Sequence, residues 1–261
     1  MGLLADILQE KAAEAAALSA EPPRVRTVDA PRDVVGALKR APGSPLGLIG
    51  EIKFRSPSAG VLSRALGPGE RARTYAAGGI AMISVLTDRR WFDGSFEHLT
   101  EARAAVSVPV LCKDFIIDPA QIDRAWAAGA DAVLLIVRGI RQAGLLPRLV
   151  EVARSRGIEP FVEVVDEHEL DVAVAAGARV IGVNARDLDN LAMDAERAKR
   201  VLASIPAGTV AVHLSGVRSG GDAATIATSR ADAALIGEAL MRCDDPSLLL
   251  KELCRGAAGQ S

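Results

Sequence analysis

The most constraining feature of the chain is a short apolar segment of the kind that forms β-strands, which recurs eight times. Between most of these segments lies an Ala-rich stretch typical of a helix, for example in residues 121–128, 167–176 and 221–229. The eight strand-like segments are residues 48–53, 82–87, 109–113, 132–137, 160–165, 180–184, 209–214 and 233–236. Because strands that alternate with helices form βαβ units, this pattern predicts parallel pairing of the strands.

Eight such units favour a closed barrel over an open doubly wound sheet, because no region of different composition marks a second domain. No G-x-G-x-x-G motif opens a helix after the first strand, which argues against a dinucleotide-binding sheet. The length of 261 residues suits one (β/α)₈ barrel. We therefore predict an α/β protein with a single (β/α)₈-barrel domain over residues 1–261.

The first 45 residues are expected to form an N-terminal helical extension packed on the barrel. Leu4, Ile7 and Leu8 begin an apolar stripe that predicts a core-covering helix over residues 3–18. Later helices are expected to end at an Ala-Gly pair, where glycine adopts the left-handed conformation. These pairs are Ala77-Gly78, Ala128-Gly129 and Ala176-Gly177.

Charge and composition exclude several classes of function. The chain has 31 basic and 33 acidic residues, so no broad positive field favours nucleic acid or an anionic membrane. Three scattered cysteines and three scattered histidines show neither a disulfide framework nor metal-ligand spacing. No signal peptide is recognisable, and no stretch approaches the roughly 20 apolar residues of a membrane span. We expect a cytoplasmic protein that binds neither nucleic acid nor membrane.

Charged and amide side chains stand where several predicted strands end. Glu51 and Lys53 are two residues apart, so their side chains share one face. The third and sixth strands end in Lys113 and Asn184, and the fifth strand carries Glu163. Because active sites of (β/α)₈ barrels lie at the C-terminal strand ends, all five are expected at one mouth. A lone charge at a strand end is often merely solvated, but burying five such groups together is costly unless they pair or meet a charged substrate.

Glycines follow the seventh and eighth predicted strands. Backbone N–H groups at Ser215-Gly216 and at Gly237 suit a phosphate, although glycine also serves ordinary turns. Residues 54–60 form a polar loop able to close over a substrate. Asp114 is interpreted as a structural residue that caps the turn after its strand. The sequence thus predicts an enzyme for a small phosphorylated substrate, without a cofactor or a metal ion.

These strand ends and loops resemble the indole-3-glycerol phosphate synthase family over nearly the whole chain. The first-strand signature is Glu51-Ile52-Lys53-Phe54-Arg55-Ser56-Pro57-Ser58. Further matching segments, in chain order, are Ser84-Val85-Leu86-Thr87-Asp88, Trp91-Phe92-Asp93-Gly94-Ser95, Pro109-Val110-Leu111-Cys112-Lys113-Asp114-Phe115, Gln121-Ile122, Gly129-Ala130-Asp131, Leu134-Leu135-Ile136, Glu163-Val164, Gly182-Val183-Asn184-Ala185-Arg186-Asp187-Leu188 and Leu235-Ile236-Gly237-Glu238-Ala239-Leu240-Met241-Arg242.

The resemblance implies a carboxy-lyase of tryptophan biosynthesis. In this family 1-(2-carboxyphenylamino)-1-deoxyribulose 5-phosphate closes its ring, loses CO₂ and water, and becomes indole-3-glycerol phosphate. Lys113 is implied as the general acid for ring closure. Glu163 is implied in dehydration, with Glu51 and Lys53 nearby, and Asn184 would orient the substrate and Glu51. The division of proton-transfer steps among these groups stays open.

The family also implies a set of substrate contacts. Ser56 and Arg186 are candidates for polar contacts, and Glu238 would reach the phosphate only through its backbone. The implied ring contacts are Phe92, Phe115 and Leu188, and the implied phosphate contacts are Ser215, Gly216, Gly237 and Glu238.

One departure from the family pattern concerns the end of the seventh strand. The family usually has Glu-Ser-Gly there, whereas this chain has Leu214-Ser215-Gly216. Strand alternation points the neighbouring His213 away, so it does not replace the missing carboxylate. We expect retained ring-closing chemistry with a reduced rate or an altered substrate.

Other hypotheses remain beside the synthase itself. A specialised paralogue would act on a modified anthranilate-derived substrate, and a non-catalytic barrel would be kept for binding. A phosphate-binding sugar isomerase is a third alternative, although it would lack the loop Ser56-Pro57-Ser58 in this context. A monomer is favoured over a dimer.

Overall fold

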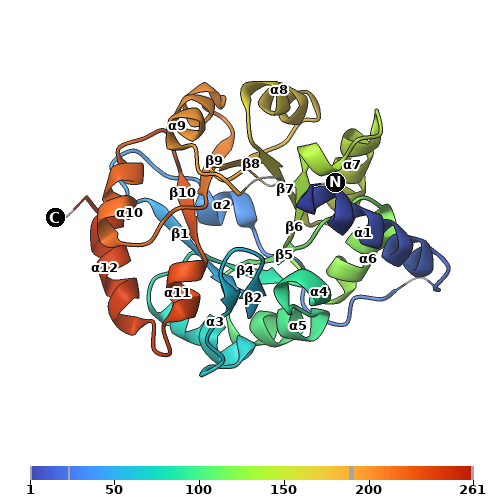
Figure 1. Cartoon of the computed structure of the whole chain (residues 1–261), viewed down its shortest axis with the longest axis horizontal. Coiled ribbons are helices and arrows are strands. Elements are labelled where there is room, and N and C mark those ends of the chain that lie inside the picture. Colours follow the sequence, from blue (N-terminus) through green and yellow to red (C-terminus); the bar gives the residue numbers. More distant parts are fainter. Residues whose placement is uncertain (1, 23, 188–190, 260–261) are drawn as a thin grey trace.

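Eight parallel strands close into a barrel in the computed structural model, which describes residues 2–22, 24–187 and 191–259 (Figure 1). The barrel order is β1-β10-β9-β8-β7-β6-β5-β4, and closure follows because β1 pairs with both β4 and β10. The strands are β1 (Gly47–Ile52), β4 (Met82–Leu86), β5 (Val110–Lys113), β6 (Ala132–Ile136), β7 (Glu159–Val164), β8 (Val180–Asn184), β9 (Val210–Leu214) and β10 (Ala233–Ile236). The predicted (β/α)₈ barrel is confirmed.

Helices surround the barrel and connect successive strands (Figure 1). They are α3 (Pro68–Ala77), α4 (Arg89–Phe92), α5 (Phe96–Ala105), α6 (Pro119–Ala127), α7 (Leu145–Ser155), α8 (Glu167–Ala175), α9 (Ala195–Ser204), α10 (Gly220–Ala227), α11 (Glu238–Arg242) and α12 (Ser247–Ala257), with a 3₁₀ turn η1 (Val137–Gly139) after β6. A small hairpin of β2 (Arg55–Ser56) and β3 (Gly60–Val61) follows β1. Most helices begin at a side-chain cap, such as Asp118, which forms a capping box with Gln121 at α6.

Several strands end one residue before the predicted position. β1 ends at Ile52, so Lys53 lies just beyond the strand, and Val137 belongs to η1 rather than to β6. Gly129 and Gly177 have positive φ, as expected for glycines after helix ends. At the end of α3 the expectation was wrong: Gly78 has φ −82°, and the following Gly79 has φ +91°. The chain continues one residue further before it takes the left-handed turn.

The alternation of side chains along the strands separates two apolar clusters. One cluster fills the barrel interior and includes Ile49, Leu111, Phe161, Val180 and Val212. The other lies between the strands and the surrounding helices. Because side chains two residues apart share a face, the interior rows continue into polar residues at the strand ends. Ile49 leads to Glu51, Leu111 to Lys113 and Phe161 to Glu163.

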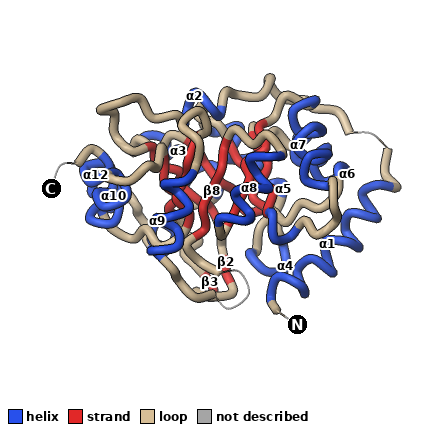
Figure 2. Tube along the Cα trace, turned by 90° about the horizontal axis from the view of Figure 1, so that it is seen from above, coloured by secondary structure: helices blue, strands red, loops and turns tan. Residues whose placement is uncertain are grey.

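The N-terminal segment reaches both ends of the barrel. Helix α1 (Leu3–Ser19) lies at the end where the strands terminate, and α2 (Val34–Leu38) lies at the opposite end (Figure 2). Leu4 and Ile7 of α1 and Val34 and Leu38 of α2 are buried in the interior cluster. The same segment therefore covers the interior from both sides.

Two aspartates at strand starts hold the segment that carries α2. The carboxylate of Asp131 accepts hydrogen bonds from the backbone of Arg32 at 2.9 Å and of Val110 at 2.8 Å. Asp232 does the same for the backbone of Arg40 at 3.1 Å and of Ala211 at 2.8 Å. Both aspartates are buried, so these bonds replace the water that the carboxylates lose on folding. Over the described ranges, no helix is both long and apolar enough to cross a membrane.

Candidate active site

One pocket at the C-terminal ends of the strands contains every described residue that the sequence singled out. These residues are Glu51, Lys53, Ser56, Phe92, Lys113, Phe115, Glu163, Asn184, Arg186, Ser215, Gly216, Gly237 and Glu238. Leu188, the remaining one, lies outside the described residues. The alternation of the strands brings the polar side chains together, because each continues an inward-facing row.

Glu51 lies at the centre of the charged part of the pocket. Its Oε1 is 2.6 Å from Nζ of Lys53, and its Oε2 is 3.6 Å from Nζ of Lys113. The carboxylate is only 3% exposed, so its charge is balanced by these two cations rather than by water. One carboxylate thus holds two lysine side chains at the mouth of the barrel.

Asn184 connects three neighbouring parts of the pocket. Its Nδ2 donates to Oε1 of Glu163 at 2.9 Å, and its Oδ1 accepts from the backbone N–H of Arg186 at 3.0 Å and from the hydroxyl of Ser215 at 2.8 Å. These three hydrogen bonds restrict the rotation of the Asn184 side chain, and both Asn184 and Glu163 are buried. Asn184 therefore holds Glu163 and the loop after β9.

The two glutamates differ in the direction of their pKa shifts. Burial raises the pKa of Glu163, and attraction to Lys113 offsets only part of that effect. Burial also disfavours ionisation of Glu51, but Lys53 and Lys113 outweigh it and lower the pKa. For Lys113, burial is outweighed by Glu51 and Glu163, so its pKa is raised. The pocket combines an ionised carboxylate, a protonated amine and a carboxyl group of raised pKa, as acid–base catalysis requires.

A second part of the pocket is formed by backbone. Ser215 and Gly216 have positive φ values of 70° and 87°, which turns the chain sharply after β9. At Gly237, between β10 and α11, an added Cβ would lie 2.3 Å from Oε1 of Glu51 and 3.1 Å from Nζ of Lys53. Only glycine allows the backbone to approach the charged groups so closely. Glu238 lines the pocket, and its side chain accepts hydrogen bonds from Arg242.

The opposite part of the pocket is apolar. The rings of Phe92 and Phe115 lie 6.0 Å apart between centroids with an interplanar angle of 32°. Leu4 and Ile7 of α1 also line this part, and sequence reasoning assigned them only to a core-covering helix. Their periodicity signalled burial, but it carried no information about which face of the barrel they cover.

Comparison with known proteins decides the family. The family model described as indole-3-glycerol phosphate synthase matches residues 4–253. The chain belongs to the indole-3-glycerol phosphate synthase family. A protein of that name from Mycobacterium avium is 45% identical over 238 residues, which are 91% of this chain and 84% of the relative. Another from Mycolicibacterium vanbaalenii is 42% identical over 260 residues, 100% of this chain and 93% of the relative.

A solved structure has the same architecture as this member of the indole-3-glycerol phosphate synthase family. Tryptophan synthase from M. tuberculosis superposes with a TM-score of 0.65 at 15% identity, covering 87% of this chain and 100% of that chain. Likeness at this identity establishes the fold alone.

Leu214 forms an apolar part of the pocket wall in this member of the indole-3-glycerol phosphate synthase family. The side chain is 3% exposed and lines the pocket at the end of β9. It packs over Gly182, where an added Cβ would lie 2.7 Å from Cδ1 of Leu214 and 2.5 Å from Phe161. His213 faces the other way, with its Nε2 2.9 Å from the backbone oxygen of Ser215. The end of β9 therefore presents an apolar wall to the pocket, and the His213 side chain does not line the pocket.

The described part of the chain offers no cluster of side chains suited to binding a metal ion. Across residues 2–22, 24–187 and 191–259, no three His, Cys, Asp or Glu side chains are grouped as metal ligands would be. The pocket's carboxylates instead face lysine and asparagine.

Proposed function

We propose that the protein catalyses the indole-3-glycerol phosphate synthase reaction on 1-(2-carboxyphenylamino)-1-deoxyribulose 5-phosphate. The observation that carries this proposal is that Lys113, Glu51 and Glu163 line the same pocket as an aromatic pair and the glycine-containing turns after β9 and β10. An aromatic ring suits the aromatic pair, and a phosphate suits backbone N–H groups of those turns. The charged groups then face the bonds that change.

The substrate is held at both ends in this proposal. Its ring packs against Phe92 and Phe115, and its phosphate is bound by the backbone at Ser215, Gly216 and Gly237. Arg186 and Ser56 supply polar contacts along the open rim, and residue Leu188 is proposed to complete the ring contacts. Fixing both ends brings the ring carbon and the ketone carbon together and removes much of the entropic barrier to ring closure.

Lys113 assists ring closure as a general acid. The ring carbon that bears the carboxylate forms a bond to the ketone carbon, and the carbonyl electron pair takes a proton from the ammonium group of Lys113. The bond to the carboxylate then breaks, CO₂ leaves, and its electron pair restores the aromatic ring. The raised pKa of Lys113 keeps the amine protonated before the reaction begins.

Dehydration uses the two glutamates in different states. Glu163, whose pKa is raised, donates a proton to the hydroxyl group formed in the first step, which leaves as water. Glu51, whose pKa is lowered, accepts the proton from the neighbouring carbon, and the indole double bond forms. Asn184 holds Glu163 in place through its 2.9 Å hydrogen bond. Lys53 keeps Glu51 ionised.

The decisive experiment is a steady-state assay of indole absorbance with EDTA-treated protein and the carboxyphenylamino substrate. The wild-type protein is expected to turn over, and Lys113→Ala to lower kcat by about 10²- to 10⁴-fold. Lys39→Ala is a matched control, because Lys39 binds Asp232 and carbonyl groups at the opposite end of the barrel. A folded wild-type protein that binds the substrate without converting it would refute the synthase assignment.

A second candidate function is favoured by Leu214. An apolar wall at the end of β9 suits a modified anthranilate-derived substrate that carries an apolar group able to reach this strand end. In that case Leu214→Glu is expected to raise kcat/KM for the unsubstituted substrate about tenfold, equivalent to about 1.4 kcal/mol of transition-state stabilisation. Leu214→Gln has the same length without the charge and serves as the control. Unchanged turnover of the unsubstituted substrate in Leu214→Glu would remove this candidate.

A further inference from the structure

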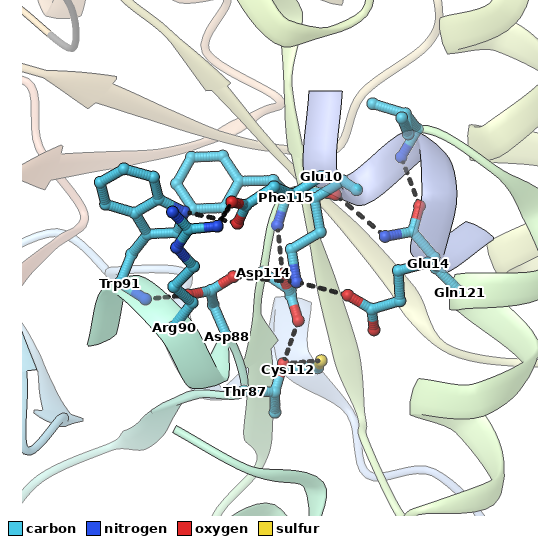
Figure 3. Close-up of polar contacts among 12 residues, drawn as sticks. Glu10, Glu14, Thr87, Asp88, Arg90, Trp91, Cys112, Asp114, Phe115 and Gln121 are labelled. Carbon is cyan, nitrogen blue, oxygen red and sulfur yellow. Dashed lines mark hydrogen bonds and ion pairs between the residues drawn. The ribbon is translucent and has the colours of Figure 1, made fainter. Parts of the chain in front are cut away.

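A buried lysine outside the proposed catalytic groups joins α1 to the loops after β4 and β5. Lys11 is 4% exposed, and its Nζ lies 2.8 Å from Oδ1 of Asp114, 3.0 Å from Oδ2 of Asp88 and 2.9 Å from Oε2 of Glu14. Figure 3 shows the side chains of Asp88, Asp114 and Glu14 directed toward a common point between α1 and these loops. Nothing in the proposed reaction uses this ammonium group.

Each of the two aspartates also organises its own loop. Asp88 caps α4 by accepting a hydrogen bond from the backbone of Trp91 at 2.7 Å. Asp114 accepts from the hydroxyl of Thr87 at 2.6 Å and from the backbone of Phe115 at 2.8 Å. The expected capping role of Asp114 is therefore present, but the residue also binds the preceding loop and α1. A single ammonium group bridges the turn after β4 and the turn after β5.

These two turns carry the apolar end of the pocket. Phe92 ends α4, four residues after Asp88, and Phe115 directly follows Asp114. Their rings face each other across 6.0 Å. Asp114 also directly follows Lys113, the proposed general acid. The distance between the two loops therefore sets both the spacing of the aromatic rings and the position of the last residue of β5.

The charge balance makes Lys11 necessary to this arrangement. Asp88 and Asp114 are each 4% exposed, so neither carboxylate is stabilised by solvent water. Burial disfavours the ammonium form of Lys11, but Asp114 and Asp88 outweigh it and raise its pKa far above neutral. Without Lys11, two buried carboxylates would face each other and push the loops apart.

Three further contacts, made by two glutamates, fasten α1 at its surface. Glu10 pairs with Arg90 of α4 and accepts a hydrogen bond from Nε1 of Trp91 at 3.1 Å. Glu14 pairs with Arg124 of α6 at 3.1 Å. These contacts are partly exposed, and such pairs contribute little on their own. They hold α1 against the barrel, whereas only Lys11 reaches both aspartates.

We infer that Lys11 is a positioning residue that sets the spacing of Phe92 and Phe115 for the aromatic ring of the substrate. The inference rests on the proposed function for the identity of the substrate. A purely structural Lys11 would affect stability alone. A positioning Lys11 would affect binding at the aromatic end of the pocket and leave the phosphate end unchanged.

The test compares Lys11→Met with wild type through KM, kcat and the binding of two probes. Anthranilate reports on the aromatic end, and inorganic phosphate reports on the glycine-rich end, both by titration calorimetry. We expect KM and the dissociation constant of anthranilate to rise about 10- to 100-fold, because small displacements of binding groups have effects of this size. The fall in kcat should be smaller, and phosphate affinity should be unchanged.

Lys39→Met is the matched control. Lys39 lies in the same N-terminal segment and also binds an aspartate, Asp232, but at the opposite end of the barrel. It should leave both probes and KM unchanged. Lys11→Met that folds and binds anthranilate as tightly as wild type would overturn the inference. Equal effects of Lys11→Met and Lys39→Met would overturn it too, because they would reflect loosening of the whole segment.

A second variant keeps the test decisive where Lys11→Met does not fold. Asp88→Asn retains the cap of α4, because asparagine caps helices as well as aspartate, and it removes only the ionic attraction to Lys11. About threefold weaker binding of anthranilate is expected, with phosphate unaffected, and no change would contradict the inference. Calorimetry needs no turnover, so failure of the proposed reaction is recognised separately by an inactive wild-type protein.

Discussion

At the residue scale, two glutamates of one pocket acquire opposite chemical properties from their neighbours. Glu51 lies beside two lysines, and its pKa falls despite burial. Glu163 accepts a hydrogen bond from Asn184, and burial raises its pKa despite the attraction of Lys113. The strands supply both residues at equivalent positions, so the difference arises from the side chains around them. The raised pKa of Glu163 also has a consequence for stability.

Replacing Glu163 should lower activity and raise stability. The folded protein binds the Glu163 proton more tightly than the unfolded chain, so the free energy of unfolding falls as pH rises above the ordinary pKa of 4.5. Glu163→Gln removes the titrating carboxyl group, and with it this pH-dependent fall in the free energy of unfolding. We expect kcat to fall about 10²- to 10⁴-fold, and urea unfolding to show a more stable variant at pH 7.

The stability gain of Glu163→Gln should shrink as pH falls below 4.5, where the native glutamate is protonated in both states. Glu101→Gln, on the exposed face of α5, is the control and should change neither quantity. A stability difference that stays the same from pH 4 to pH 8 would show that Glu163 is not the titrating group.

At the element scale, the junction between β10 and α11 brings backbone against the charged groups of the pocket. Gly237 is the whole connection between the strand and the helix. Its missing side chain leaves room for the carboxylate of Glu51 and the ammonium group of Lys53. Most residue types could join a strand to a helix. At this junction the backbone is also part of the proposed phosphate site, which adds a further requirement.

Substitution at this junction should damage catalysis more than folding. In Gly237→Ala the new Cβ would displace the Glu51–Lys53 pair, so we expect kcat/KM to fall about 10- to 100-fold. The free energy of unfolding should fall by about 1–3 kcal/mol, as is usual when a close-packed site is overfilled. Gly208→Ala is the control, because a Cβ there meets nothing within 4 Å. Wild-type kinetics in Gly237→Ala would contradict the assigned close approach.

At the scale of the whole molecule, the N-terminal segment connects the two ends of the barrel. At one end Asp131 is fully buried and lies near the guanidinium groups of Arg26, Arg32 and Arg103. At the other end Lys11 holds α1 against the loops of the pocket. The segment thus links packing at the N-terminal ends of the strands to the proposed site at their C-terminal ends.

Removing Asp131 should destabilise the protein without altering the pocket. Asp131→Ala leaves three arginines and two backbone N–H groups without their shared carboxylate, so we expect the free energy of unfolding to fall by about 3–5 kcal/mol. Urea denaturation measures this loss. KM of the folded variant should remain that of wild type. Asp123→Ala, which breaks an exposed pair with Arg156, should cost about 1 kcal/mol or less, and equal losses in both variants would disprove the buried role.

The order of strands and helices and the parity of the interior rows could be predicted from the sequence alone. Hydrophobic period and glycine position are local properties, and a closed barrel is the compact solution for eight such units. The inward direction of Glu51, Lys113 and Glu163 followed from the same alternation. The sequence could not locate α1 over the pocket, because an apolar stripe indicates that a helix is buried but not which surface of the barrel the helix covers.

Only the tertiary structure decided which charges meet. Lys11 looks like an ordinary lysine in an Ala-rich helix, and its partners Asp88 and Asp114 lie more than 70 residues away in the chain. Likewise, the hydrogen bond between Asn184 and Glu163, which lie on neighbouring strands, could not be assigned from the sequence. Local sequence determines periodicity and the direction of each side chain from its strand. The partner of a charge depends on how the packed elements are spaced, which is a property of the folded chain as a whole.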